Sequence, residues 1–164
     1  SFDLPVKIVR PFNTYGPRQS ARAVIPTIIS QLLSKQNSVM LGNLSPTRDL
    51  TYVADTCNAF IDIYQSDSLF GQVTNVGMNS DISIGDLANL IANIMDNKVK
   101  IESSQERIRP ENSEVEILVC DNSKILTQTS WRPKYSLRQG IKEVIEWMTN
   151  PKRISLYKSG NYNV

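Results

Sequence analysis

The chain has 164 residues, of which 40% are hydrophobic and 21% are charged, and this composition is ordinary for a globular domain and excludes a disordered or collagen-like chain. The formal net charge of +2 is small and neither sign is concentrated, so we expect no nucleic-acid partner. Histidine is absent, which excludes a Ser-His-Asp triad, a Cys-His pair and any histidine-ligated metal site.

The first part of the chain alternates between strand and helix patterns. Residues 4–9 are a short apolar run that predicts a buried strand, and residues 10–23 predict a loop. Pro26 then suits the first turn of a helix. The apolar residues on one face of that helix are Ile25, Ile28, Ile29, Leu32 and Leu33. Residues 38–41 predict the next strand, and Gly42 turns the chain after it.

The middle of the chain repeats this alternation. Residues 48–53 predict an extended segment, and a second helix follows it. The apolar positions that mark this helix are Val53, Cys57, Phe60, Ile61 and Tyr64. Residues 72–76 predict another strand. Ser83 and Asp86 then form a capping box, which predicts the start of a third helix.

The last part adds two strands and one helix. Residues 99–102 and 115–119 predict strands on either side of a polar loop. Ser136 can cap a final amphipathic helix. The segment 151–164 is polar and we expect it to be a mobile tail, which leaves residues 1–150 as the folded portion. Because strands and helices interleave throughout, the predicted fold class is α/β.

Three loops outside the predicted helices carry side chains suited to anion binding. The loop 10–18 after the first strand contains Asn13 and two arginines, Arg48 opens an extended segment, and Arg107 and Arg109 lie in the polar loop 103–114. Amide donors and the planar guanidinium fork both suit phosphate oxygens. Each position also has an ordinary interpretation, as a turn, a surface ion pair or a solvated loop charge. We expect Asp55 to cap the helix that follows the extended segment.

Several kinds of site are not found in the sequence. It has no glycine-rich phosphate-binding loop, no Tyr-x-x-x-Lys pair and no carboxylate pair with a spacing that indicates acid–base catalysis. We therefore assign no catalytic residue and no metal ligand. Cys57 and Cys120 are expected to be reduced core thiols of a cytoplasmic protein. The longest charge-free stretches are shorter than a membrane-spanning helix, so we expect no membrane partner.

Taken in chain order, these segments resemble the extended short-chain dehydrogenases/reductases, the NAD-dependent epimerases and dehydratases of nucleotide sugars. The similar segments are 6–17 (VKIVRPFNTYGP), Ile25-Pro26, 39–42 (VMLG), 48–55 (RDLTYVAD), 75–77 (NVG), Ser83-Ile84, Arg109-Pro110, 121–124 (DNSK) and 131–133 (WRP). The similarity covers residues 1–150. Within the family, 109–115 and 120–124 look most like the 4,6-dehydratases acting on nucleotide-linked N-acetylglucosamine in nonulosonic acid synthesis.

The resemblance implies a role for several residues. The substrate's diphosphate would be bound by Asn13, Arg48 and Arg109. The nucleobase would be lined by Ala23, Val24, Val39 and Leu41. The nicotinamide of NAD would pass Pro11 and Phe12. Asp49 and Asp55 match motif positions, but we interpret them as structural.

The resemblance also shows which family elements are missing from this sequence. These are the amino-terminal dinucleotide-binding half with its glycine-rich turn, the catalytic Tyr-x-x-x-Lys and the Asp-Glu pair of some 4,6-dehydratases. We therefore expect the carboxy-terminal substrate-binding half of such an enzyme, with the last strands of its Rossmann sheet, and we expect it to be inactive alone. The intact parent is expected to use NAD, to act as a lyase or isomerase on a UDP-N-acetylglucosamine-like substrate in polysaccharide biosynthesis, and to form a homodimer.

Three alternatives remain open from the sequence. The parent could be a 4-epimerase or 4-reductase of the same family, because the same diphosphate contacts serve all of these reactions. The chain could instead be a free-standing nucleotide-sugar-binding module without catalysis. It could also be a structural interaction domain in which the loop arginines are solvated.

Overall fold

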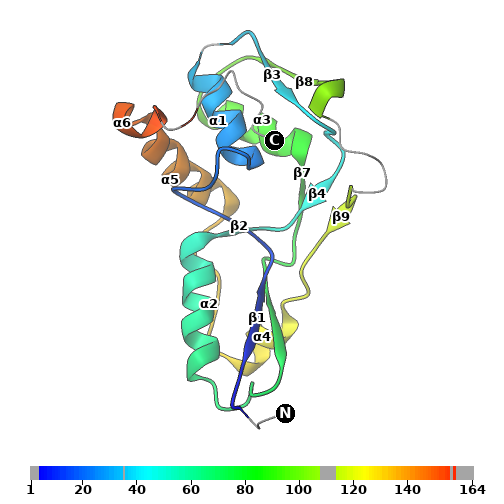
Figure 1. Ribbon diagram of the computed structural model, residues 1–164, viewed down its shortest axis with the longest axis vertical. Helices are drawn as coiled ribbons and strands as arrows, with labels where there is room; N and C mark the ends of the chain where they lie inside the picture. Colours follow the sequence, from blue (N-terminus) through cyan, green and yellow to red (C-terminus); the bar gives the residue numbers. More distant parts are fainter. Residues whose placement is uncertain (1–3, 35, 108–113, 156, 158–164) are drawn as a thin grey trace.

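The computed structural model describes residues 4–34, 36–107, 114–155 and 157. Strands and helices alternate along the chain and form an elongated molecule with a lower and an upper part, as Figure 1 shows. Between the two parts, β2 (Asn13–Tyr15) pairs in parallel with β5 (Leu50–Tyr52). This α/β architecture with parallel strand pairs confirms the predicted fold class.

The lower part in Figure 1 is a parallel strand pair packed against helices. β1 (Ile8–Pro11) pairs with β6 (Val73–Val76), and α2 (Val53–Gln65) contacts both strands. α4 (Ser123–Gln128) contacts β6. The buried hydrophobic residues here are Ala59, Ile63, Leu69, Val76, Ile125 and Trp131. They give the lower part a core of its own.

The core of the upper part is formed mainly by helices. α1 (Val24–Leu33), α3 (Ile84–Ile94) and α5 (Leu137–Thr149) contact one another. Their fully buried side chains are Ile25, Ile28, Ile29, Leu87, Ile91, Ile141 and Met148. The predicted first, third and final helices are therefore confirmed, with their apolar faces turned inward.

One edge of the upper part is a second parallel strand pair. β3 (Ser38–Leu41) pairs with β8 (Lys100–Ser103), and a short 3₁₀ turn, η1 (Gln105–Arg107), follows β8. The strands predicted at 38–41 and 99–102 are thus confirmed within one residue. The turn carries the chain from β8 back along β3, so that Arg107 comes close to Met40.

A short three-stranded ladder completes the upper part. β4 (Thr47–Arg48) pairs in parallel with β9 (Ile117–Leu118) and in antiparallel fashion with β7 (Ile82–Ser83). The extended segment predicted at 48–53 is therefore divided, because its residues pair with two different sets of partners. Asp49, the residue at the division, is fully buried.

The first strand differs from the prediction. The structure places β1 at Ile8–Pro11 rather than at 4–9, and Leu4 and Val6 are 68% and 50% exposed. Ile8 is paired with Val73, the first residue of β6, so the earlier residues have no strand to pair with in the described part of the chain.

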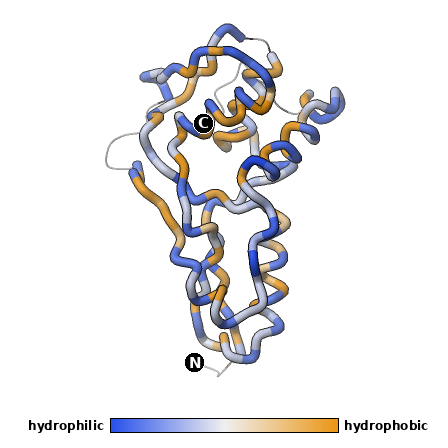
Figure 2. Tube along the Cα trace, turned by 180° about the vertical axis from the view of Figure 1, so that it is seen from behind, coloured by the Kyte–Doolittle hydropathy of each residue, from blue (hydrophilic) through white to orange (hydrophobic). Residues whose placement is uncertain are grey.

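The apolar face predicted for the second helix is also largely exposed. On α2, Phe60, Ile61 and Tyr64 are 47%, 52% and 80% exposed, and the buried residues of the helix are Asp55, Thr56, Ala59 and Ile63. Cys57 is exposed as well, so the prediction that both cysteines are core thiols is wrong for Cys57 and confirmed for Cys120. The tube in Figure 2 shows hydrophobic residues along this helix.

Part of the segment expected to be a mobile tail is folded against the upper part. α6 (Pro151–Ile154) contacts α5, and its first turn is capped by the side chain of Asn150. The Tyr157 hydroxyl donates a hydrogen bond of 2.8 Å to the backbone oxygen of Gln19. Among the described helices, none has the length and hydropathy needed to cross a membrane.

Candidate substrate-binding site

A pocket of about 340 Å³ opens in the upper part where several segments converge. These include the first residue of β2 and the segment after that strand, the start of α1, the end of β3, the strand β4, Arg107 at the end of η1 and Glu114 before β9. Of the residues that the sequence analysis assigned to substrate binding, those lining the pocket are Asn13, Ala23, Val24, Leu41 and Arg48. The fold thus brings together residues that are well separated in the sequence.

Asn13 is held at the pocket by the central strand pair. The register of β2 and β5 places Asn13 opposite Leu50. Its side-chain Nδ2 donates a hydrogen bond of 3.2 Å to the backbone oxygen of Asp49. Because Arg48 comes directly before Asp49, the amide and the guanidinium of the two predicted diphosphate ligands line the same cavity.

The guanidinium of Arg48 is fixed by contacts from its own strand, β4, and from the segment that precedes β9. Nη1 donates hydrogen bonds to the backbone oxygens of Thr47 and Val115, at 2.7 and 2.6 Å. Nη2 donates to Glu114 Oε1 at 2.8 Å, and the two side chains are 17% and 15% exposed. These three contacts hold the planar fork at the pocket wall before any ligand is bound.

Two further arginines make the pocket strongly cationic. Arg107 lines it, and its Nη1 donates a hydrogen bond of 2.8 Å to the backbone oxygen of Met40. Arg22 also lines it and is exposed. Among the described lining residues, Glu114 is the only carboxylate, so positive charge exceeds negative. A concave surface with this charge balance favours a small anion.

Sequence reasoning did not single out Gln19 and Arg22, which both line the pocket. Gln19 Nε2 donates a hydrogen bond of 3.2 Å to the backbone oxygen of Thr14, and its Oε1 is buried without a hydrogen-bond partner in the described residues. Neither residue differs from an ordinary polar loop residue in the sequence. The loop predicted at 10–23 in fact contains the end of β1 and the whole of β2, so only residues 16–23 form a connecting segment. The folding of this segment, where the Tyr157 hydroxyl donates to the backbone oxygen of Gln19, reveals the two residues.

Other predicted site residues lie elsewhere. Val39 is 1% exposed and belongs to the hydrophobic core of the upper part rather than to the pocket lining. Pro11 and Phe12 lie at the carboxyl end of β1, where the backbone N–H of Phe12 donates a hydrogen bond of 2.9 Å to Val76. Neither lines the pocket. Arg109 lies outside the described residues.

Asp49 has a structural position behind the pocket. Its carboxylate is fully buried and accepts hydrogen bonds from the backbone N–H groups of Met78, Asn79 and Cys120, at 2.8, 2.9 and 3.1 Å. Hydrogen bonds to a buried charge are among the stronger stabilising contacts in proteins. The carboxylate therefore ties the turn after β6 and the segment after β9 to the strand segment that carries Arg48.

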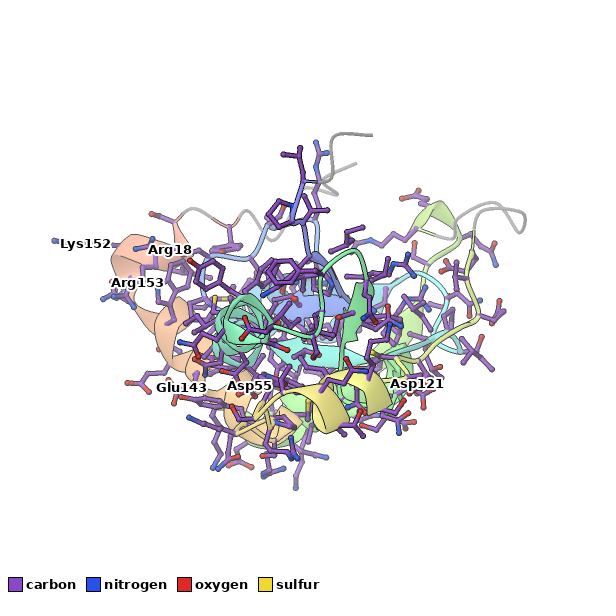
Figure 3. All side chains as sticks on the ribbon, turned by 90° about the horizontal axis from the view of Figure 1, so that it is seen from below. Arg18, Asp55, Asp121, Glu143, Lys152 and Arg153 are labelled. Atoms are coloured by element: carbon purple, nitrogen blue, oxygen red, sulfur yellow. The ribbon has the colours of Figure 1, made fainter. Side chains whose placement is uncertain are left out.

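Asp55 is also structural, but it does not cap α2 as predicted. The residue that precedes α2 is Tyr52, and it makes no side-chain capping bond. The buried carboxylate of Asp55 instead accepts hydrogen bonds of 2.9 and 3.0 Å from the backbone N–H groups of Lys134 and Tyr135. Figure 3 labels Asp55, which belongs to α2, and Asp121, which lies just before α4.

Two groups that could serve as a base or nucleophile are held in their neutral forms by burial. Burial raises the pKa of the Tyr15 hydroxyl far above its usual value, with smaller contributions from Tyr52 and Asp55. Burial also raises the pKa of the Cys120 thiol to about 12, with added repulsion from Asp49 and Asp121. Neither Tyr15 nor Cys120 lines the pocket, so we assign no proton transfer to either group.

The parallel strand pairs, the interleaved helices and the cationic pocket define one part of an extended short-chain dehydrogenase/reductase of the nucleotide-sugar epimerase and dehydratase class. The chain belongs to the GDP-mannose 4,6-dehydratase family, whose pattern matches residues 1–144. It is 30% identical over 152 residues to dTDP-D-glucose 4,6-dehydratase of Homo sapiens, and the match covers 89% of this chain and 42% of that protein.

Solved structures have the same fold. Pal from Bacillus thuringiensis is 35% identical, with a TM-score of 0.79 over 91% of this chain and 47% of that one. The UDP-glucuronic acid 4-epimerase of Bacillus cereus, in complex with UDP-glucuronic acid and NAD, is 25% identical, with a TM-score of 0.80 over 90% of this chain and 46% of that one. The chain thus spans about half the length of the relatives that it matches.

Proposed function

We propose that this chain is the substrate-binding part of an NAD-dependent nucleotide-sugar 4,6-dehydratase, and that its pocket holds the diphosphate of a UDP-N-acetylglucosamine-like substrate. The observation that carries the proposal is the presence of Asn13 and Arg48 in one cavity. Arg107 adds a second guanidinium from another segment. An amide and two guanidinium forks from separate segments can neutralise a diphosphate and fix its orientation. Arg109 is proposed to add to these contacts.

The apolar part of the pocket suits the rest of the nucleotide. Ala23, Val24 and Leu41 are among the lining residues, and they offer an apolar surface on which a planar base can lie. With the diphosphate held by Asn13 and Arg48, the sugar would be kept at a fixed distance from these residues. Holding a reacting group in one position contributes to catalysis without any proton transfer by the residues that hold it.

NAD is the cofactor expected for the family, and the carboxyl ends of β1 and β6 fit one edge of a nicotinamide site. In open α/β sheets, ligands bind beyond the carboxyl ends of the strands. Pro11 and Phe12 lie at that end of β1, and Asn75 in β6 has a buried side-chain oxygen without a hydrogen-bond partner in the described residues. When bound, NAD supplies hydride acceptance and return. The residues of this chain would orient the substrate toward that edge and move no proton.

Calorimetric titration of the 164-residue chain with UDP-N-acetylglucosamine tests the proposal. We expect binding by the wild-type chain and a loss of affinity of at least about tenfold in Arg48→Ala, because a charge-assisted contact to phosphate is removed. Arg138→Ala is the matched control, since it removes an exposed arginine on α5 that does not line the pocket. Absence of binding, or equal affinity in Arg48→Ala, contradicts the proposal.

A further inference from the structure

The carboxylate of Glu114 at the pocket is unusual because the ligand expected there is itself an anion. Glu114 lines the pocket, and its Oε1 accepts a hydrogen bond of 2.8 Å from Arg48 Nη2. Both side chains are largely shielded from water, at 15% and 17% exposure. In such a position a charge interacts more strongly with its neighbours than it would in bulk water.

Orientation of Arg48 alone does not account for Glu114. Arg48 Nη1 already donates two hydrogen bonds, to the backbone oxygens of Thr47 and Val115. Two contacts from one end of a planar guanidinium fix its plane. The further contact to Glu114 therefore adds a negative charge to an arginine that backbone groups already hold in place.

The effect of that negative charge depends on the charge of the ligand. Among the described residues that line the pocket, three are arginines (Arg22, Arg48 and Arg107) and one, Glu114, is a carboxylate. A nucleotide sugar has its diphosphate esterified at both ends. A nucleoside diphosphate has a free terminal phosphate, which carries one more negative charge near pH 8. A nucleoside triphosphate carries a further one. Repulsion by Glu114 grows with each of these charges.

We propose that Glu114 is a specificity-determining residue that weakens the binding of nucleotides with a free terminal phosphate relative to that of a diphosphate esterified at both ends. The inference rests on the proposed function of the pocket and adds to it a selection among nucleotides. Specificity of this kind comes from a repulsive element directed against the wrong ligand. It would allow a site with several arginines to bind its substrate in the presence of free nucleoside diphosphates and triphosphates.

The test compares UDP-N-acetylglucosamine, UDP and UTP as ligands of the wild-type chain and Glu114→Gln by calorimetry at pH 8. Glutamine keeps an acceptor oxygen for Arg48 and removes the charge. Glu116→Gln is the matched control, because it removes the same charge at a position two residues further along the chain. The side chain of Glu116 is exposed and does not line the pocket.

We expect Glu114→Gln to change the ratio of the affinities for UDP-N-acetylglucosamine and UDP by about fivefold in favour of UDP. This is the effect expected when one ligand charge lies several ångströms from a partly buried carboxylate. The shift should be larger for UTP and absent in Glu116→Gln. Unchanged preferences in Glu114→Gln, or an equal loss for all three ligands, overturn the inference while the proposed function stands. If none of the three ligands binds the wild-type chain, the proposed function fails and the inference fails with it.

Discussion

The side chain of Asn13 donates a hydrogen bond of 3.2 Å to the backbone oxygen of Asp49, the residue that follows Arg48. Asn13, the first residue of β2, is thereby linked to the residue that adjoins Arg48 in β4. The parallel pairing of β2 with β5 sets this geometry. Nucleotide affinity should therefore be sensitive to the charge at position 13.

We expect Asn13→Asp to weaken UDP-N-acetylglucosamine binding by more than about tenfold. The substitution keeps the size of the side chain but places a carboxylate beside the proposed diphosphate, and it removes the donor to Asp49. Calorimetric titration measures the effect. Asn89→Asp, at an exposed position on α3, introduces the same charge away from the pocket. Equal affinities for the two variants would show that Asn13 lies outside the diphosphate site.

Asp49→Asn should lower the free energy of unfolding by about 2 to 4 kcal/mol, because the buried carboxylate accepts three backbone hydrogen bonds and an amide cannot accept them all. Urea unfolding followed by circular dichroism measures the change. Asp81→Asn is the control, since Asp81 is exposed and makes no comparable contacts. A change below about 0.5 kcal/mol for Asp49→Asn would contradict the structural role that we assign to it.

The two cysteines should differ sharply in reactivity. Burial raises the pKa of the Cys120 thiol to about 12, so at pH 8 it stays protonated, and the thiolate is the reactive form. Cys57 is exposed on α2. Alkylation by iodoacetamide at pH 8, followed by mass spectrometry, should modify Cys57 first and Cys120 only after denaturant is added. Equal rates for both thiols in the folded chain would contradict the burial of Cys120.

The exposed apolar face of α2 should make the isolated chain associate and bind hydrophobic dyes. Phe60, Ile61 and Tyr64 are exposed there, and exposed apolar side chains on one helix promote contact with other molecules. The double substitution Phe60→Lys with Ile61→Lys should reduce dye fluorescence and shift the chain toward monomer in analytical ultracentrifugation. Asn89→Lys with Asn93→Lys, on exposed positions of α3, adds the same charge elsewhere. A wild-type chain that is monomeric and binds no dye would contradict this prediction.

The sequence allowed much of the upper part to be predicted, because its helices carry strong local signals. Ser83 and Ser136 cap α3 and α5 with hydrogen bonds to backbone N–H groups three residues later. Such caps involve only neighbouring residues, so they can be recognised without knowledge of the fold. The inward apolar faces of α1, α3 and α5 follow from the same local periodicity.

Features that depend on distant contacts could not be derived in this way. The cap predicted for Asp55 is wrong because its carboxylate bonds to Lys134 and Tyr135, which lie far along the chain. The periodicity of α2 predicts a helix correctly but cannot show which face is covered. Gln19 reaches the pocket through a loop that Tyr157 holds from the other end of the chain. Asn13 and Arg48 were found through resemblance to a family, since their residue types alone also fit ordinary surface roles.

The measurement that tests the central claim most directly is a crystal structure of the 164-residue chain with UDP-N-acetylglucosamine. The account predicts the diphosphate in the pocket between β2 and β4, within hydrogen-bond distance of Asn13 and Arg48, and the base near Val24 and Leu41. A ligand bound elsewhere, with the side chains of Asn13 and Arg48 making no contact to phosphate, would contradict the assignment of this pocket to the nucleotide sugar.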